Sequence, residues 1–302
     1  MGPSFLCRPD IFVSACWRKI RQRPPRFLAR TAWGDTLEVE PRRFIGAKIY
    51  MRGVHELAVC EALWRLTRPC DRAVDVGANI GVMTSVLSRR AAEVLAFEAH
   101  PQLFGQLERN VRRWNRNISV MQRAVSNESG YVKLCEGNWF GINEGTASIE
   151  HENENEKEYE DDAAPIEVTA VRLDDAVESC DVMKVDVEGH EFEVLEGAAG
   201  LLKGRAVRDI VFESGFPSRT HDLLAGYGYE LFELREGLWG PALVEAKTQS
   251  PRADYLATLD AERARRIMGK PGWQVLRARA GCKLKIENRK IQIGKRMSVS
   301  KS

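Results

Sequence analysis

The chain of 302 residues is 44% hydrophobic and 29% charged, a composition typical of a soluble globular protein that can bury one sizeable core. No stretch approaches the ~20 apolar residues of a membrane-spanning helix, and the seven dispersed cysteines include no Cys-x-x-Cys pair. These features argue against a membrane-spanning protein, a disulfide framework and a zinc site. We therefore expect reduced thiols, no bound metal and a cytoplasmic location.

The net charge of +2 hides an uneven distribution along the chain. Residues 1–50 carry ten Lys/Arg against four Asp/Glu, and residues 252–302 carry fourteen against four, so both ends are basic and the middle is acidic. We expect residues 1–50 and 261–302 to form flexible basic extensions, the second partly disordered, on either side of a main domain at 51–260. Such ends suit either weak contact with a membrane surface or a solvated tail.

The most informative segment begins with a strand and a glycine-bearing turn. Apolar residues on both sides of Asp75 predict a strand that is buried on both faces. Gly77 allows a sharp turn and close approach of a ligand, and Asn79 tolerates a positive φ. Gly81 would let the following helix pack closely on the strand. The turn is therefore a candidate site for a cofactor at the carboxyl edge of a parallel sheet.

A second strand after this helix ends at Glu98, followed by Pro101 at the start of another helix. Glu98 lies 21 residues after Gly77, near the ~20 residues expected for a carboxylate that binds the ribose hydroxyls of a nucleotide. The unit thus predicts a site for an adenosine-containing cofactor.

The order of the glycines distinguishes between cofactors. A nicotinamide enzyme would need Gly-x-Gly-x-x-Gly, whereas this turn has Gly77-x-x-x-Gly81. Asp75 is expected to place a negative charge at the mouth of the site, which would repel a diphosphate and attract an ammonium or a sulfonium. These residues favour S-adenosylmethionine over NAD, and an NAD-dependent oxidoreductase is the alternative.

The ordered set of motifs resembles the FkbM family of S-adenosylmethionine-dependent methyltransferases. The resemblance extends over about Gly53 to Leu259, although Ala99 stands where a proline is common. It implies a class I methyltransferase fold, O-methylation of a hydroxyl, and a position for Glu56 facing the cofactor mouth. The matching segments are Asp75–Gly81, Phe97–Pro101, Ala124–Ser126, Arg172–Asp175, Lys184–Glu191 and Phe212–Glu213.

Alternating strands and helices predict an α/β fold with a doubly wound, mostly parallel, Rossmann-like sheet of seven strands. Beside it, Tyr131–Cys135 and Ile166–Val171 are expected to form a hairpin. Between these lies an acidic run, 150–162, which we expect to be a disordered loop. A further strand is possible at Trp273–Arg277. The seven predicted strands lie at about 73–76, 94–97, 118–123, 182–187, 209–213, 229–234 and 254–259.

The cluster from Lys184 to Glu191 is the best candidate for catalysis. Methyl transfer to a hydroxyl benefits from a base within hydrogen-bond reach. Asp186 falls near the carboxyl end of a buried strand, and Glu188 and His190 are expected at the rim of the cleft. We assign Asp186 to positioning of the cofactor or acceptor, Glu188 as the first candidate base and His190 as the second.

The predicted cofactor site combines the glycine turn, the ribose-binding acid and residues near them. The acceptor is expected to be a hydroxyl of a small molecule, glycan or lipid, and not a nucleic acid. A non-enzymatic adaptor that binds membranes or nucleic acid through the basic ends is the alternative from another class. The predicted cofactor-binding residues are Asp75, Gly77, Asn79, Gly81, Glu98, Ser126, Asp186 and Glu56.

Overall fold

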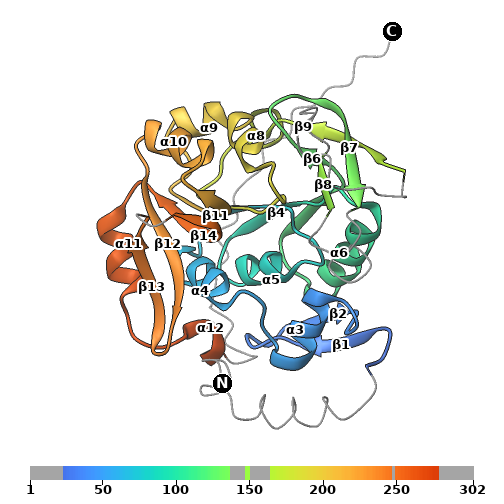
Figure 1. The fold of residues 1–302 in the computed structure, drawn as a ribbon. Helices are drawn as coiled ribbons and strands as arrows, with labels where there is room; N and C mark the ends of the chain where they lie inside the picture. Colours follow the sequence, from blue (N-terminus) through green and yellow to red (C-terminus); the bar gives the residue numbers. More distant parts are fainter. Residues whose placement is uncertain (1–22, 137–146, 150–163, 247–248, 279–302) are drawn as a thin grey trace, which may run out of the picture.

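The structure is a computed structural model, and it describes residues 23–136, 147–149, 164–246 and 249–278 (Figure 1). Its centre is an eight-stranded sheet with the order β13-β12-β14-β11-β10-β3-β4-β5. The strands are β3 (Arg72–Val76), β4 (Glu93–Phe97), β5 (Ile118–Met121), β10 (Val182–Val185), β11 (Asp209–Phe216), β12 (Glu230–Gly237), β13 (Gly240–Glu245) and β14 (Ser250–Thr258).

The neighbours β11, β10, β3, β4 and β5 are all parallel, as predicted, and β14 runs antiparallel between β11 and β12. All seven predicted strands are present. The eighth, β13, pairs antiparallel with β12 at the edge of the sheet. The sequence did not predict it because Gly240 and Pro241 begin it, and these residues usually mark a turn. Proline is compatible with a strand mainly at a sheet edge, which is where β13 lies.

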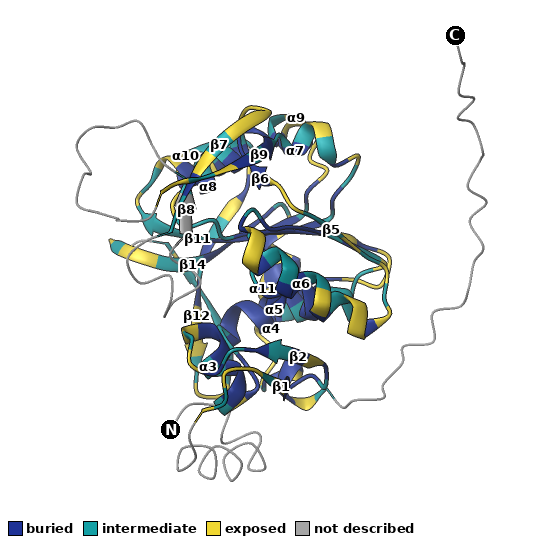
Figure 2. Ribbon diagram, turned by 90° about the vertical axis from the view of Figure 1, so that its right-hand side faces the viewer, coloured by how far each residue is buried: buried dark blue, intermediate teal, exposed yellow. Residues whose placement is uncertain are grey.

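Helices cover both faces of this sheet. In Figure 1, α4 (Leu57–Leu66), α5 (Val82–Ser88) and α6 (Pro101–Trp114) lie below it, and α8 (Glu191–Glu196), α9 (Ala199–Lys203) and α10 (Arg219–Gly226) lie above it. Successive strand residues contribute to opposite layers, because Ala73 packs in the core on the α4 side and Val74 in the core on the α8 side. Figure 2 shows that buried residues concentrate in the strands between these layers.

A second, four-stranded sheet lies beside the main one. It has the order β6-β9-β7-β8 and consists of β6 (Ala124–Val125), β7 (Gly130–Glu136), β8 (Ala147–Ile149) and β9 (Ile166–Val171). The predicted hairpin strands are β7 and β9, and they pair antiparallel with Tyr131 opposite Thr169. The short helix α7 (Leu173–Ala176) follows β9. The acidic run 150–162 lies outside the described residues.

Part of the segment predicted as a flexible basic extension is folded. Residues 27–52 form β1 (Phe27–Arg30), β2 (Thr36–Val39) and α3 (Phe44–Arg52). Trp33, Leu37 and Ile49 are fully buried, and the indole nitrogen of Trp33 donates a hydrogen bond to Ser85 in α5. The high Lys/Arg content of the segment concealed these few apolar side chains, which are enough to dock it on the core. Residues 1–22 lie outside the described part of the chain.

The C-terminal segment is also partly folded, as α11 (Ala261–Met268) and α12 (Gln274–Arg277). The predicted strand at Trp273–Arg277 is therefore wrong. The carboxylate of Glu61 in α4 accepts the backbone N–H groups of Gln274 at 2.7 Å and Val275 at 2.8 Å, which satisfies the first turn of α12. A short apolar run does not distinguish helix from strand, and a cap supplied from residue 61 leaves no local signal.

Glu61 also forms a buried ion pair with Arg65, whose Nε lies 2.5 Å from its Oε1. The Arg65 guanidinium donates hydrogen bonds to the backbone carbonyls of Met268, the last residue of α11, at 3.1 Å and of Lys270 at 2.7 Å. One turn of α4 thus holds both C-terminal helices. Across the described ranges, no helix is long and apolar enough to cross a bilayer.

We expect Asp35→Asn to destabilise the protein by about 3 kcal/mol, because Arg89 and Arg116 would lose their shared buried partner. The neighbouring guanidinium groups hold the pKa of Asp35 below its ordinary value, although burial acts to raise it. Its stabilising contribution is therefore present above the pKa of the unfolded chain and lost as the pH falls through the lower folded value. Urea unfolding at pH 7 measures the change.

The matched control is Glu108→Gln, which removes an exposed ion pair between Glu108 and Arg112 on α6 and should change stability by less than about 1 kcal/mol. Equal effects of the two substitutions would contradict the structural role of Asp35.

Candidate functional site

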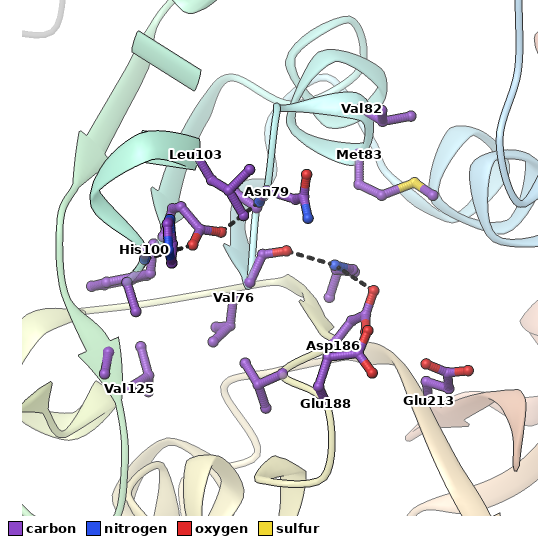
Figure 3. A pocket seen from close by; sticks show the side chains of 18 of the residues that line it. Val76, Asn79, Val82, Met83, His100, Leu103, Val125, Asp186, Glu188 and Glu213 are labelled. Atoms are coloured by element: carbon purple, nitrogen blue, oxygen red, sulfur yellow. Dashed lines mark hydrogen bonds and ion pairs between the residues drawn. The ribbon is translucent and has the colours of Figure 1, made fainter. Parts of the chain in front are cut away.

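A cavity of about 290 Å³ opens at the carboxyl ends of β3, β4 and β10, the edge where ligands bind in open α/β sheets. Figure 3 shows that Asp186, Glu188 and Glu213 lie at one end of the cavity and that His100, Leu103 and Val125 lie at the other. Asn79 lies between them, beside the turn that follows β3. The cavity therefore has one carboxylate-rich end and one mainly apolar end.

The turn after β3 is shaped by Gly77, which has a φ of +73°. A Cβ atom at this position would lie 1.8 Å from the carbonyl oxygen of Asp186, so only glycine allows β3 and β10 to approach here. The backbone N–H groups of Gly77 and Ala78 both donate to the carbonyl of Phe97, at 3.0 and 2.9 Å. Gly77 and Asn79, which has the predicted positive φ, line the cavity.

Glu98 lines the cavity at the end of β4, where the spacing of the sequence put it. Its carboxylate accepts the backbone N–H groups of Asn79 at 2.7 Å and His100 at 2.8 Å. Burial raises the pKa of Glu98 to about 7, against the effect of these two hydrogen bonds. Each carboxylate oxygen keeps a further lone pair, so Glu98 can still accept hydrogen bonds from a ligand.

Asp75 is not at the mouth of the site, so that expectation was wrong. Its side chain is fully buried and does not line the cavity. Thr84 in α5 donates a hydrogen bond to one carboxylate oxygen at 2.5 Å, and the ammonium of Lys184 lies 3.8 Å from the other. The strand directs Asp75 toward the face that α5 covers, and its negative charge is partly compensated inside the protein. The charge at the mouth comes from other carboxylates.

Lys184 connects the ends of two strands beneath the cavity. Its ammonium donates to the carbonyl oxygen of Gly77 at 3.0 Å and lies 3.1 Å from the carboxylate of Asp186. Burial opposes the charge, yet Asp186 and Asp75 raise the pKa of Lys184 above its ordinary value. The lysine thus remains charged and holds Asp186 in place beside the glycine turn.

Arg252 in β14 bridges two carboxylates at the acidic end of the cavity. One guanidinium nitrogen donates to Glu188 and, at 2.5 Å, to Glu213. Burial and the nearby Asp186 raise the pKa of Glu188 to about 7, although Arg252 acts to lower it. Glu188 has a φ of +55°, so the turn before α8 is held in a conformation that few non-glycine residues adopt.

The carboxylates of Asp186, Glu188 and Glu213 each offer an oxygen within 4.8 Å of the others, a spacing that a divalent cation could use. Arg252 already compensates two of them, and one arginine shared between two acids resembles a charge-paired site more than a vacant metal site. These contacts do not test the prediction that the protein binds no metal, which stays a prediction.

Glu56 lines the cavity, as the family resemblance implied. Its carboxylate lies 3.1 Å from Nε2 of His55. Although burial acts to raise the pKa of Glu56, His55, Lys184 and Arg252 hold it below its ordinary value. Phe44, half exposed in α3, lies edge-on to His55 with ring centroids 5.8 Å apart and also lines the cavity.

Besides Asp75, three predicted site residues do not reach the cavity. His190 is buried, and its Nε2 lies 2.9 Å from the hydroxyl of Ser126, so neither residue lines the site. His190 directly precedes α8, and the turn at Gly189 directs the imidazole beneath the rim. Gly81 serves packing, because a Cβ atom there would lie 2.8 Å from the side chain of Leu107 in α6. The expected place of His190 at the rim of the cleft is therefore wrong, and its role as a base stays an untested prediction.

Sequence reasoning missed Phe44, His55 and Arg252 as cavity residues. Phe44 and His55 flank the end of the segment predicted as an extension. Arg252 lies on an antiparallel strand that pairs with β11, so its contact with Glu188 depends on strand order. The sequence placed Arg252 just before the strand predicted at 254–259, and this position does not indicate which carboxylate it pairs with.

A model of the methyltransferase FkbM domain family matches residues 75–231. Methyltransferase sdnD of Sordaria araneosa is 28% identical over 214 residues, which cover 58% of this chain and 81% of that protein. The hexuronic acid methyltransferase AglP of Haloferax volcanii is 32% identical over 134 residues, covering 43% of this chain and 50% of that protein.

Among solved structures, methyltransferase FkbM from Methylobacillus flagellatus KT superimposes with a TM-score of 0.40 at 15% sequence identity. The superposition covers 85% of this chain and 60% of that chain.

We expect Gly77→Ala to destabilise the protein by at least about 2 kcal/mol, since alanine disfavours this φ and its Cβ would collide with the Asp186 carbonyl. Urea unfolding measures the loss. The matched control is Gly226→Ala at the end of α10, where a Cβ atom meets nothing within 4 Å and stability should be kept or slightly raised. An unfolding midpoint for Gly77→Ala equal to that of the wild type would contradict the close approach of the Gly77 turn to the Asp186 carbonyl.

Proposed function

Because the chain belongs to the FkbM methyltransferase domain family, we propose that it transfers a methyl group from S-adenosylmethionine to a hydroxyl of a glycan-type acceptor. The similarity to a hexuronic acid methyltransferase supports a carbohydrate acceptor, although this chain spans half the length of that relative. The observation that carries the proposal is Glu98, a buried carboxylate at the end of β4 that faces the cavity next to the Gly77 turn.

The residues present fit S-adenosylmethionine better than a dinucleotide. Five carboxylates line the cavity against three Lys/Arg side chains, a charge that suits an ammonium and a sulfonium and would repel a diphosphate. In this proposal Glu98 accepts hydrogen bonds from the ribose hydroxyls, the apolar end near Val125 holds the adenine, and Asp186 faces the cationic part of the cofactor. The excess of carboxylates in the cavity also argues against the alternative of an NAD-dependent oxidoreductase.

The protein's own contribution to the reaction is position and a proton acceptor. When bound, S-adenosylmethionine supplies an electrophilic methyl group. Glu188 lines the cavity at its acidic end, and its carboxylate accepts the proton of the acceptor hydroxyl. Asp186, fixed by Lys184, orients the ligands beside it. Arg252 keeps Glu188 directed along the cavity wall through their ion pair.

The partners proposed here are the methyl donor and the hydroxyl acceptor. Contact with a membrane surface through the basic ends stays a prediction, as does the absence of a nucleic-acid partner, because residues 1–22 and 279–302 lie outside the described part of the chain.

We expect Glu98→Gln to weaken binding of S-adenosylmethionine about tenfold or more, because an amide replaces a charged acceptor of ribose hydrogen bonds. Isothermal titration calorimetry with the donor and with S-adenosylhomocysteine measures this, and Glu108→Gln should bind as the wild type does. If the wild-type protein binds NAD tightly and neither methyl-donor ligand, the proposed function is wrong.

We expect Glu188→Gln to keep donor binding and to reduce turnover by about 100-fold or more, the usual contribution of a general base. For the wild type, kcat should fall about tenfold per pH unit below pH 7, because protonation of a carboxyl with a pKa of about 7 removes the base, and it should level off above that pH. Release of S-adenosylhomocysteine measures both. Unchanged turnover in Glu188→Gln would exclude Glu188 from the mechanism.

A further inference from the structure

The acidic end of the cavity is formed by Glu56, Asp186, Glu188 and Glu213, with Asp254 next to them. Asp254 is adjacent because its Cα pairs with that of Glu213 across β11 and β14. The carboxylates come from four separate parts of the chain, so their convergence is a property of the folded cavity. The Gly77 turn lies between them and the apolar end, where the adenine is proposed to bind.

Two fixed positive charges compensate this group incompletely. The ammonium of Lys184 is shared between Asp75 and Asp186, and the guanidinium of Arg252 is shared between Glu188 and Glu213. Each cation therefore faces two carboxylates. In addition, Glu56 contacts His55, and Asp254 is held near Glu56, Glu213 and Asp186.

Burial and the neighbouring acids affect the titration of these groups. Burial, together with Glu56, Glu213 and Asp186, raises the pKa of Asp254 to about 8. The pKa of Glu213 is also raised, first by burial and then by Asp186, although Arg252 opposes the shift. Glu56 shows the reverse direction, because His55, Lys184 and Arg252 hold its pKa below the ordinary value although burial acts to raise it.

The methyl donor does not remove this excess. S-adenosylmethionine has an ammonium, a sulfonium and one carboxylate, which amount to one net positive charge. At least one further carboxylate at the acidic end then lacks a counterion when the donor is bound. An acceptor placed beside Glu188 meets this remaining field, which is strong because the cavity walls have a low dielectric constant.

We propose that the acidic end selects an acceptor that carries a protonated amine, such as an amino sugar, and that it disfavours acceptors that carry a carboxylate. This inference rests on the proposed function, because it concerns the acceptor of the same reaction. The ammonium group binds among Glu56, Glu213 and Asp254, while the hydroxyl to be methylated faces Glu188. Repulsion of a negatively charged acceptor contributes to specificity as much as attraction of the amine.

The residues that set this charge lie partly outside the segment that matches the family. Glu56 precedes residues 75–231, and Arg252 and Asp254 follow them. The half-exposed ring of Phe44 is also outside this segment and offers an apolar surface next to His55. The selectivity is thus assigned to parts of this chain beyond the family segment, and it can differ from the acceptor preference of the relatives.

The test compares three acceptors of equal size: methyl glucosaminide, methyl glucoside and methyl glucuronide. Their binding to wild-type protein saturated with S-adenosylhomocysteine is measured by calorimetry at low and high salt. We expect the amine to bind at least tenfold more tightly than the uncharged glycoside, the carboxylate to bind most weakly, and the differences to shrink as salt rises. Equal responses to the three glycosides, or tighter binding of the glucuronide, would overturn the inference.

A charge variant separates the field from other effects. Glu56→Gln should lower the preference for the amine over the uncharged glycoside about fivefold, whereas Glu108→Gln on the outer surface should leave it unchanged. An unaltered preference in Glu56→Gln would remove Glu56 from the selective group. Failure of the donor product itself to bind would be a different result, because it would contradict the proposed function before any acceptor is compared.

Discussion

The arrangement of the site depends on a buried ammonium group. Lys184 lies between the carboxylates of Asp75 and Asp186 and donates a hydrogen bond to the carbonyl of Gly77. Two acids this close would repel one another inside the sheet, and a carbonyl beside them would add to the cost. The positive charge of Lys184 offsets these repulsions. It thereby allows β3 and β10 to end side by side, with the Gly77 turn close to the Asp186 carbonyl.

The carboxylates around Lys184 and Arg252 differ in their roles. Asp75 is an internal counterion, held by Thr84 and Lys184, and contributes structure. Asp186 is in contact with the same lysine but reaches the cavity. Glu188 and Glu213 share a guanidinium that is itself half exposed, so their surroundings can respond to a ligand. Each cation is thus shared by two carboxylates, and the donor and acceptor are proposed to bind beside the carboxylates that line the cavity.

Much of the fold was predictable because the sheet is buried on both faces and its strands form continuous apolar runs. The glycine turn and Glu98 were predictable too, since a sharp turn and a strand end have local signatures. The side-chain direction of Asp75 was not, because it depends on which helix covers that face. Arg252 and the cap of α12 by Glu61 depend on pairs of residues far apart in sequence, and such contacts leave no periodic pattern.

The hydrogen bonds between α4 and the C-terminal helices have a consequence for biosynthesis. Glu61 and Arg65 receive their backbone partners from residues 267–275, about two hundred positions later in translation. Until that stretch leaves the ribosome, the nascent protein holds a charged pair at its centre whose remaining hydrogen bonds are unmade. The last step of core formation must therefore follow the synthesis of residues 267–275, and it closes a very long loop. Nascent chains of this protein are then expected to need shielding from aggregation until these residues have been made.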